Sequence, residues 1–164
     1  MDAAADPRHV LFRAGGERFA LPLEAVREVV NPQPPFARVP RASEAVLGAM
    51  NLRGRVVAVV DLAPLVGLPP QALEPGRGQV VVLDRDRRAL GLLIEGVLGV
   101  EALGPPERGE AGTVARGVVS VSGNPVTVLD PDVLTDQSCA LFGDAEPRPR
   151  GEPVLVRQAK PVVT

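Results

Sequence analysis

One stretch predicts the fold, Gly48-Ala49-Met50-Asn51-Leu52-Arg53-Gly54-Arg55-Val56-Val57-Ala58-Val59-Val60-Asp61-Leu62. Its pattern predicts two strands joined by a tight turn. Successive side chains of a strand point to opposite faces, so Val57 and Val59 share one face and Val60 lies on the other. Both faces of the second strand are apolar, which predicts burial on both sides. Arg53 stands in the turn, and a stiff apolar hairpin with an arginine at its tip suits a recognition element.

The pattern of this stretch occurs twice in the chain, which predicts an internal duplication. The recurring positions are Gly48, Gly54, Val57, Asp61 and Leu65 in the first copy and Gly117, Gly123, Val126, Asp130 and Leu134 in the second. The segments Val10–Val29 and Val81–Val100 also match at a nearly constant shift. The two copies therefore span about residues 8–67 and 79–136.

Each copy is expected to contain five short strands. The expected strands are 8–14, 17–22, 25–30, 46–52 and 55–61, and then 79–84, 88–94, 97–102, 115–121 and 125–130, with helical turns at 62–66 and 131–134. Five short strands with Gly and Pro turns make a small barrel. We therefore expect one barrel from each copy, the two packed together in one domain over 7–142. A linker at 69–78, a polar loop at 104–113 and a flexible Pro-rich tail at 143–164 complete the chain.

Composition narrows the class of protein. The 164 residues are 45% hydrophobic but only 2% aromatic, so the core must be built from Val, Leu and Ala. The net charge is −2 and Lys160 is the one lysine, which argues against the basic surface of a nucleic-acid binder. A single cysteine, Cys139, fits a reducing compartment. Without a signal-peptide pattern or an apolar run of about 18 residues, we expect a cytoplasmic protein with no direct membrane insertion.

The sequence offers no convincing set of catalytic residues. His9 is the only histidine, and we expect it to be exposed at the start of the first strand. A nucleophilic site needs a base held by an orienting group. Cys139 has no histidine partner other than His9, so we interpret it as a small apolar residue near the last helix. Asp84-Arg85-Asp86 predicts a hairpin turn rather than a metal loop. We therefore expect a binding module with no metal and no cofactor.

The two copies differ in charge at matched positions, and this difference points to a candidate binding site. Glu28 aligns with Gly99, and Arg53 aligns with Ser122. One interpretation is a surface ion pair worth about 0–1 kcal/mol. The other is a Glu28 carboxylate that orients the Arg53 guanidinium toward a partner. Beside the pair we expect an apolar groove between the barrels that suits an amphipathic helix. Its candidate residues, which fit a core equally well, are Val26, Leu93, Ile94, Val97 and Val100.

The sequence resembles the CheW family, the coupling proteins of bacterial chemotaxis and related signalling arrays. The resemblance rests on Gly16-x-x-Phe19-Ala20-Leu21-Pro22-Leu23-x-x-Val26-x-Glu28-Val29, Val39-Pro40, Gly48-x-x-Asn51-Leu52-Arg53-Gly54-x-Val56-Val57-x-Val59-Val60-Asp61-Leu62 and Gly91-Leu92-Leu93-Ile94-x-x-Val97. A weaker match is Gly117-Val118-x-x-x-x-Gly123-x-x-Val126-x-Val128-Leu129-Asp130. The resemblance implies an all-β fold of two packed five-stranded SH3-like β-barrels with short helical turns.

The resemblance also implies an adaptor without enzymatic activity. CheW proteins bind the cytoplasmic tip of methyl-accepting chemotaxis receptors and the regulatory domain of the histidine kinase CheA, and so place the kinase under receptor control. In the family the receptor helix lies along the groove between the barrels. The receptor-binding residues implied for this chain are Val26, Glu28, Gly48, Asn51, Arg53, Gly54, Leu93 and Val97.

Departures from the family pattern keep a second function open. Ala58 stands where the family usually has Pro, the loop between Val100 and Val114 is short, and the Pro-rich tail is extra. The alternative is a CheW-like module that binds only the receptor or only the kinase in a non-flagellar chemosensory pathway. A small β-barrel enzyme or a nucleic-acid binder is disfavoured by the missing catalytic base, basic patch and aromatic residues.

Overall fold

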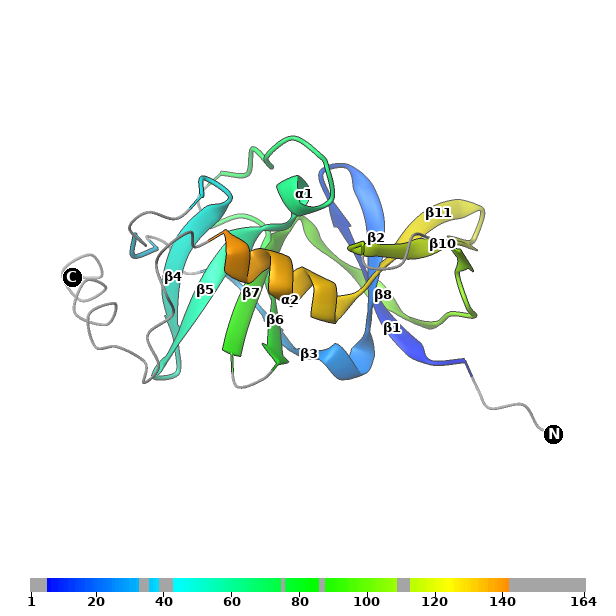
Figure 1. Ribbon diagram of the computed structural model, residues 1–164, viewed down its shortest axis with the longest axis horizontal. Helices are drawn as coiled ribbons and strands as arrows, with labels where there is room; N and C mark the ends of the chain where they lie inside the picture. The colour runs from blue at the N-terminus through cyan, green and yellow to red at the C-terminus, as the bar shows by residue number, and fades with distance from the viewer. Residues whose placement is uncertain are drawn as a thin grey trace.

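Two curled β-sheets packed side by side form the described part of the protein (Figure 1). The structure is a computed structural model that describes residues 6–32, 36–38, 43–74, 76–85, 88–108 and 113–141, without the side chains of residues 84, 85, 88 and 108. The tail expected at 143–164 lies outside the described residues. Among the helices of the described segments, none combines the length and the apolar character that a membrane crossing requires.

The predicted strands are all present, and each begins and ends within one residue of its predicted limits. The first repeat gives β1 (Arg8–Ala14), β2 (Glu17–Pro22), β3 (Val26–Val30), β4 (Val46–Leu52), β5 (Arg55–Asp61) and α1 (Leu62–Leu65), with the 3-10 turn η1 (Leu23–Ala25) before β3. The second gives β6 (Gln79–Arg85), β7 (Arg88–Ile94), β8 (Gly96–Ala102), β9 (Glu107–Arg108), β10 (Ala115–Val121), β11 (Asn124–Leu129) and α2 (Pro131–Ala140). The two-residue strand β9 falls in the expected polar loop, and α2 extends six residues beyond its predicted end.

Each sheet takes strands from both repeats. The six-stranded sheet has the order β8-β1-β2-β11-β10-β9, and the five-stranded sheet has the order β3-β6-β7-β5-β4. The hairpin β1–β2 of the first repeat thus joins strands of the second, and the hairpin β6–β7 joins strands of the first. The expectation that each repeat builds its own barrel is therefore wrong. Both repeats carry the same apolar alternation, so sequence pattern does not reveal which copy a hairpin joins.

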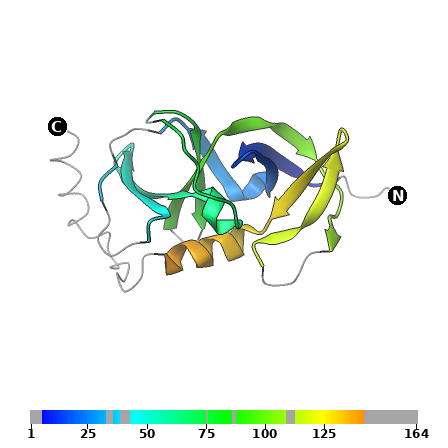
Figure 2. The same ribbon diagram turned by 90° about the horizontal axis from the view of Figure 1, so that it is seen from above.

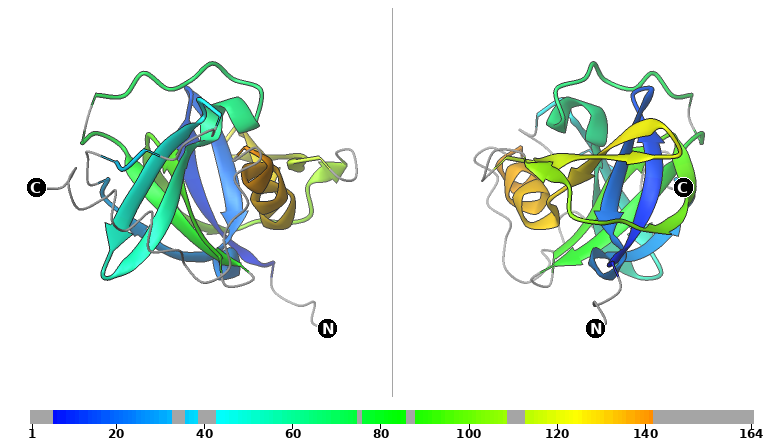
Figure 3. Two further views of the ribbon diagram at one scale, coloured as in Figure 1. Left: turned by 60° about the vertical axis from the view of Figure 1, so that its left-hand side comes forward. Right: turned by 90° about the vertical axis from the view of Figure 1, so that its right-hand side faces the viewer.

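Corresponding strands of the two predicted repeats pair in the same way. The strand β1 pairs with β2 and β8, and its counterpart β6 pairs with β7 and β3 in the same antiparallel sense. The parallel pair β2–β11 is matched by the parallel pair β7–β5. Figure 3 shows that both sheets are strongly curled. The all-β class with two packed sheets and short helical turns is thus confirmed, although the hydrogen bonds of the described strands leave each sheet open at two edges.

Two matched glycines mark matched irregularities in the sheets. The register shifts between Val46 and Gly48 in β4, and between Ala115 and Gly117 in β10. The φ angles are +139° at Gly48 and +155° at Gly117, values that side chains rarely allow. A Cβ added at Gly48 would lie 2.6 Å from the carbonyl oxygen of Ala37. These positions therefore require glycine, because another segment of backbone passes directly over the bulge.

Three apolar clusters fill the described part of the fold. The central core lies between the sheets and contains Val10, Phe12, Ala14, Phe19, Leu21, Val60, Leu62, Val81, Leu83, Leu90, Leu92, Ile94, Val114, Leu129 and Leu134. Met50, Leu52, Val57, Val59, Val80, Val82 and Leu93 form the core of the five-stranded sheet, and Leu11, Ala20, Leu103, Val126 and Val128 form that of the six-stranded sheet. Val57 and Val59 thus face one core while Val60 faces another, which confirms the alternation and the two-sided burial predicted for β5.

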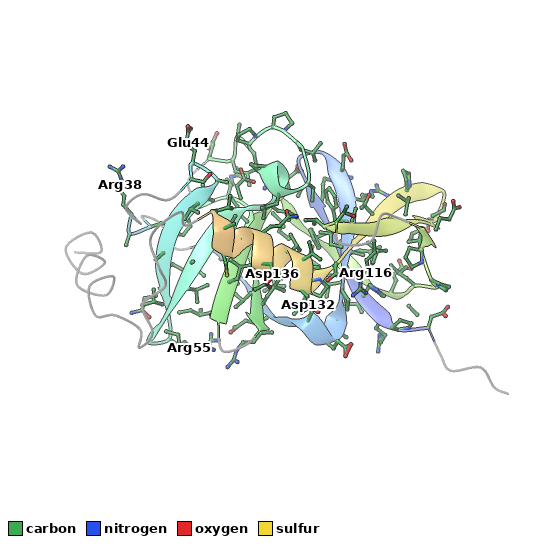
Figure 4. All side chains as sticks on the ribbon, in the orientation of Figure 1. Arg38, Glu44, Arg55, Arg116, Asp132 and Asp136 are labelled. Carbon is green, nitrogen blue, oxygen red and sulfur yellow. The ribbon has the colours of Figure 1, made fainter. Side chains whose placement is uncertain are left out.

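The helices begin at matched aspartates. The Oδ1 atom of Asp61 accepts a hydrogen bond from the Ala63 N–H at 3.0 Å, and Oδ1 of Asp130 accepts from the Asp132 N–H at 2.9 Å. Figure 2 shows α2 running along one side of the molecule, and it contacts α1 and β6. In Figure 4, Arg116 lies near the first turn of α2. Its Nε donates to the Asp130 carboxylate at 3.3 Å.

Candidate functional site

The Arg53 guanidinium donates a hydrogen bond to the Glu28 carboxylate, as the sequence comparison of the two repeats suggested. Glu28 lies on β3 and Arg53 lies in the turn between β4 and β5. Because β3 and β4 are the two edges of the five-stranded sheet, this ion pair links both ends of an otherwise open sheet. The Arg27 Nε stands 3.9 Å from the same carboxylate oxygen. The Arg53 side chain is 68% exposed, so its guanidinium faces solvent as well as Glu28.

The turn that carries Arg53 is held by Asn51. The Asn51 Oδ1 accepts a hydrogen bond from the Gly54 N–H at 2.7 Å, which closes the turn around Leu52 and Arg53. Arg53 has a φ of +50° and Gly54 a φ of +87°. The side-chain bond therefore supports a backbone conformation that is uncommon for an arginine. Asn51, Arg53 and Gly54 are all exposed at this tip.

An apolar strip lies along the boundary between the sheets. Val26 pairs with Leu83 across strands, and Val97 pairs with Phe12, so both valines share a face with central-core residues. Both are only half-buried. The two sheets are tied together here, since the Val97 N–H donates to the Gln79 side-chain oxygen at 2.8 Å. The edge strands β3 and β8 thus present matched valines on either side of the central core.

Three neighbouring residues extend this strip. Val29 pairs with Val81 and Val100 pairs with Val10, and both partners belong to the central core. Val100 is 43% exposed, and Leu98, in the bulge of β8, is 50% exposed. Exposed large apolar side chains close together on an edge strand are typical of interaction surfaces, so these residues make a candidate binding surface. We call Val26, Val29, Val97, Leu98 and Val100 the boundary strip.

The predicted site residues fall into three groups. Glu28, Asn51, Arg53 and Gly54 meet at the tip of the five-stranded sheet, and Val26 and Val97 lie in the boundary strip. Leu93 is 8% exposed in the core of the five-stranded sheet, and Ile94 is fully buried in the central core. Gly48 is buried at the bulge beneath Phe36 and Ala37. Leu93 and Gly48 therefore offer no free surface in this conformation.

The sequence reasoning missed Val29 and Leu98. A usable signal for Val29 was present, because it aligns with Val100 in the second repeat and Val100 was already a candidate. Leu98 aligns with the charged residue Arg27 in the first repeat, so the comparison of the copies did not mark Leu98 as part of an apolar surface. Its exposure comes from the bulge in β8, which no pattern in the sequence announces.

His9 is 6% exposed, so the expectation of an exposed histidine is wrong. The strands β2 and β8 flank it on both sides, because His9 pairs with Pro22 and with Glu101. Its Nδ1 lies 3.0 Å from the Pro7 carbonyl oxygen. Cys139 is half-buried on α2. Within the described residues, no three His, Cys, Asp or Glu side chains form a group able to hold a metal ion.

Fold and site together define a class of protein: an all-β scaffold of two packed sheets with a partly exposed apolar strip and a charged hairpin tip. The chain belongs to the CheW family, because the model of the CheW-like domain matches residues 8–139. It is accordingly an adaptor of chemotaxis-type signal transduction.

Individual relatives agree with this family. A probable chemotaxis protein CheW of Rhizobium etli is 28% identical over 141 residues, which cover 81% of this chain and 90% of the relative. Protein PilI of Pseudomonas aeruginosa is 33% identical over 90 residues, covering 55% of this chain and 49% of PilI. The crystal structure of the scaffolding protein TtCheW from Thermoanaerobacter tengcongensis has the same fold, with a TM-score of 0.65 and 20% identity over 76% of this chain and 89% of that one.

Proposed function

We propose that this chain is a non-enzymatic adaptor that joins the cytoplasmic tip of a methyl-accepting receptor to the regulatory domain of the histidine kinase CheA. It acts in the cytoplasm and meets the membrane through its partners. Family membership supports this proposal, and the boundary strip beside the Glu28–Arg53 pair is the observation that carries it. The alternative, a module that binds only one of the two partners, uses the same surface.

The receptor helix lies along β3 and the boundary strip in this proposal. An amphipathic helix places anchors at every third or fourth residue on one face, and such a row matches exposed valines on two neighbouring edge strands. Val26 and Val97 supply the apolar contact. Because β3 is an edge strand, a helix beside it reaches Val26 on one face and the Glu28–Arg53 pair on the other. Leu93 and Gly48 hold these strands in place from inside.

Arg53 contacts the receptor in this account, and Glu28 orients it. The Glu28 carboxylate takes one edge of the guanidinium, and the remaining donors of the planar fork face solvent and the partner. Asn51 and Gly54 set the turn from which Arg53 projects. In the second repeat Ser122 occupies the matched turn with a φ of +52°, so the scaffold needs the turn but not the charge.

The test is the variant Arg53→Glu. We expect its affinity for a receptor signalling tip to fall about tenfold or more, because a carboxylate then faces Glu28 and the partner. Its fold and its binding to the kinase regulatory domain are expected to stay intact. Ser122→Glu serves as the matched control, since it places a carboxylate at the corresponding turn of the other sheet. Unchanged receptor binding by Arg53→Glu would reject the assigned site.

A second variant separates contact from positioning. The exchange Glu28→Arg with Arg53→Glu rebuilds the ion pair across the sheet edges with its charges reversed. We expect the exchanged protein to fold but not to regain receptor binding, because the cation then projects from β3 rather than from the turn. Full recovery of binding would mean that the pair only fastens the sheet. Pull-downs with each partner separately distinguish the adaptor from the one-partner module.

A further inference from the structure

Two arginines lie directly opposite each other on the hairpin β1–β2. Arg13 of β1 pairs with Arg18 of β2 in the antiparallel register. Residues paired in this way point to the same face of the sheet, with Cβ atoms about 4.5–5.5 Å apart. Both side chains are half-buried rather than free in solvent. Like charges opposite each other destabilise a hairpin, so the fold has no need of this arrangement.

Neither arginine has an ion-pair partner within the described part of the chain. Two carboxylates lie at the same turn. Glu17 begins β2 opposite Ala14, and the Glu95 carboxylate accepts a hydrogen bond from the Gly16 N–H at 2.7 Å. Glu95 thus helps to hold the turn. Within the described residues, Arg13 and Arg18 thus form no ion pair with either carboxylate.

The second repeat shows that the scaffold folds without this pair of cations. The positions that align with Arg13 and Arg18 are Asp84 and Ala89, which pair with each other in the hairpin β6–β7. The same hairpin geometry therefore forms with an aspartate and an alanine at these two positions. A charge arrangement that occurs in one copy only, and opposes stability there, indicates a role outside the fold.

The surroundings of the two arginines suit a docked peptide. On the side of β1 away from β2, Arg13 pairs with Gly96 of β8. Because glycine has no side chain, Gly96 does not cover the Arg13 side chain. By alternation Arg13 and Arg18 share a face with Leu11 and Ala20, which belong to the core of the six-stranded sheet. The same core extends to half-buried Val119 and Val121 on β10. The parallel pairing of β2 with β11 brings the β1–β2 and β10–β11 turns to the same end of that sheet.

We propose that Arg13 and Arg18 form a docking site for an acidic segment of a partner protein, separate from the receptor site at the boundary strip and the Arg53 tip. Two guanidinium groups side by side bind a pair of carboxylates through charge-assisted hydrogen bonds, and each group accommodates one carboxylate in a bidentate manner. The half-buried valines at the same end favour an apolar residue within the acidic segment. Binding there relieves the repulsion between the two cations.

The test is an NMR titration of the full chain with an eight-residue polyglutamate peptide, at low salt. We expect shifts in the backbone amides of residues 13–18 and in the arginine side-chain signals, lost at high salt because charges carry the binding. Arg18→Glu should weaken this binding about tenfold or more. It should also raise the melting temperature by up to about 4 °C, because it converts a like-charge pair into an opposite-charge pair.

The controls keep the outcomes distinct. Arg8→Glu makes the same charge change at an exposed position of β1 and should leave the titration unchanged. Arg18→Glu should also bind the receptor tip normally. If the docking site for an acidic segment proves wrong, the proposed adaptor function is therefore unaffected. Polyglutamate shifts that are absent, or equal in wild type and Arg18→Glu, would overturn the proposal. The proposal would also be overturned if inorganic phosphate caused these shifts and polyglutamate did not. A lower melting temperature of Arg18→Glu than of the wild type would contradict it as well.

Discussion

Arg53 and Ser122 share a backbone conformation that few residues other than glycine adopt. Their φ angles are +50° and +52°, and each is followed by a glycine with a φ above +80°. The turn itself is therefore inherited by both repeats, whereas the guanidinium is specific to one. Uncommon backbone conformations persist where the surroundings hold them in place. At Arg53 the surroundings include the Asn51 side chain and the Glu28 carboxylate.

Replacing Asn51 by alanine tests whether the turn depends on this side chain. Asn51→Ala removes the acceptor for the Gly54 N–H, and an exposed intramolecular hydrogen bond of this kind contributes about 0.5–1.5 kcal/mol. We expect a loss of that size in the urea unfolding free energy, together with weaker receptor binding as Arg53 loses its fixed position. Asn124→Ala removes only a 3.4 Å contact to the Ser122 carbonyl and should change neither. Equal effects of the two variants would contradict this role.

The Asp130 carboxyl makes the stability of the protein depend on pH. Burial raises its pKa, but the Val133 and Asp132 N–H groups and the Arg116 guanidinium together hold the pKa below the ordinary 3.8. A carboxyl with a lowered pKa stabilises the folded state above its unfolded pKa, and this contribution is lost as the pH falls through the folded pKa.

We therefore expect Asp130→Asn to be less stable than the wild type at pH 7, with the difference shrinking below about pH 3.8. Urea unfolding of both proteins at several pH values measures the difference. Arg116→Gln removes one of the groups that lower the pKa, so its loss of stability should also be smaller in acid. A gap between wild type and Asp130→Asn that widens in acid would contradict the assigned interactions.

Sequence pattern predicted residue burial well inside strands and poorly at their ends. The alternation of Val57, Val59 and Val60 followed from the two-residue period alone. His9 was misjudged because a position near the start of a strand gives no information about its neighbours in space. Its burial depends on β8, which comes some 90 residues later in the chain.

At the scale of elements, the matched bulges of β4 and β10 shape the two sheets. Each bulge lets a second piece of backbone cross closely, as Ala37 does over Gly48. A bulge increases the local twist of its strand. The hairpin β4–β5 consequently bends until its tip reaches β3, where the ion pair forms.

The variant Gly48→Ala tests this close approach. Its Cβ would lie 2.6 Å from both the Ala37 oxygen and the Phe36 Cβ, so the crossing segment has to move. Gly123→Ala provides the control, because its φ is also positive but nothing lies within 4 Å of the added carbon. We expect the control to lose about 1 kcal/mol from backbone strain and Gly48→Ala to lose clearly more in urea unfolding. Equal losses would mean that the crossing backbone yields freely.

The helix α2 shows where element prediction failed. The sequence pattern indicated a short helical turn at 131–134, and the residues that follow include Thr135 and Ser138, which are weak helix formers. In the structure the Thr135 hydroxyl donates to the Pro131 carbonyl, and Leu134 packs in the central core. The contacts of α2 with α1 and β6 extend the helix to Ala140. Tertiary packing, which the local sequence does not report, overrides the weak propensity.

At the scale of the whole molecule, the exchange of hairpins makes the two repeats interdependent. Each sheet contains the hairpin of one repeat and three main strands of the other. The central core draws residues from both. Sequence matching predicted the duplication and every described strand except β9, but similar patterns in both copies left the pairing partners undetermined.

Separate production of the two halves tests this interdependence. Neither residues 1–74 nor residues 75–164 contain a complete sheet, so we expect each half alone to give a poorly dispersed NMR spectrum. Mixing the halves should restore the dispersed spectrum of the intact chain, because each then supplies the missing hairpin. A half that folds alone, with dispersed amide signals, would contradict the exchanged arrangement.

The central claim is that one molecule of this adaptor joins a receptor to a kinase, through a receptor site at the boundary strip and the Arg53 tip. Mass photometry or size-exclusion chromatography of a receptor signalling tip, the CheA regulatory domain and this chain tests it most directly. We predict a three-component complex with the wild-type chain, and only the complex of chain and kinase domain with Arg53→Glu. A wild-type chain that binds either partner alone but never both together would contradict the claim.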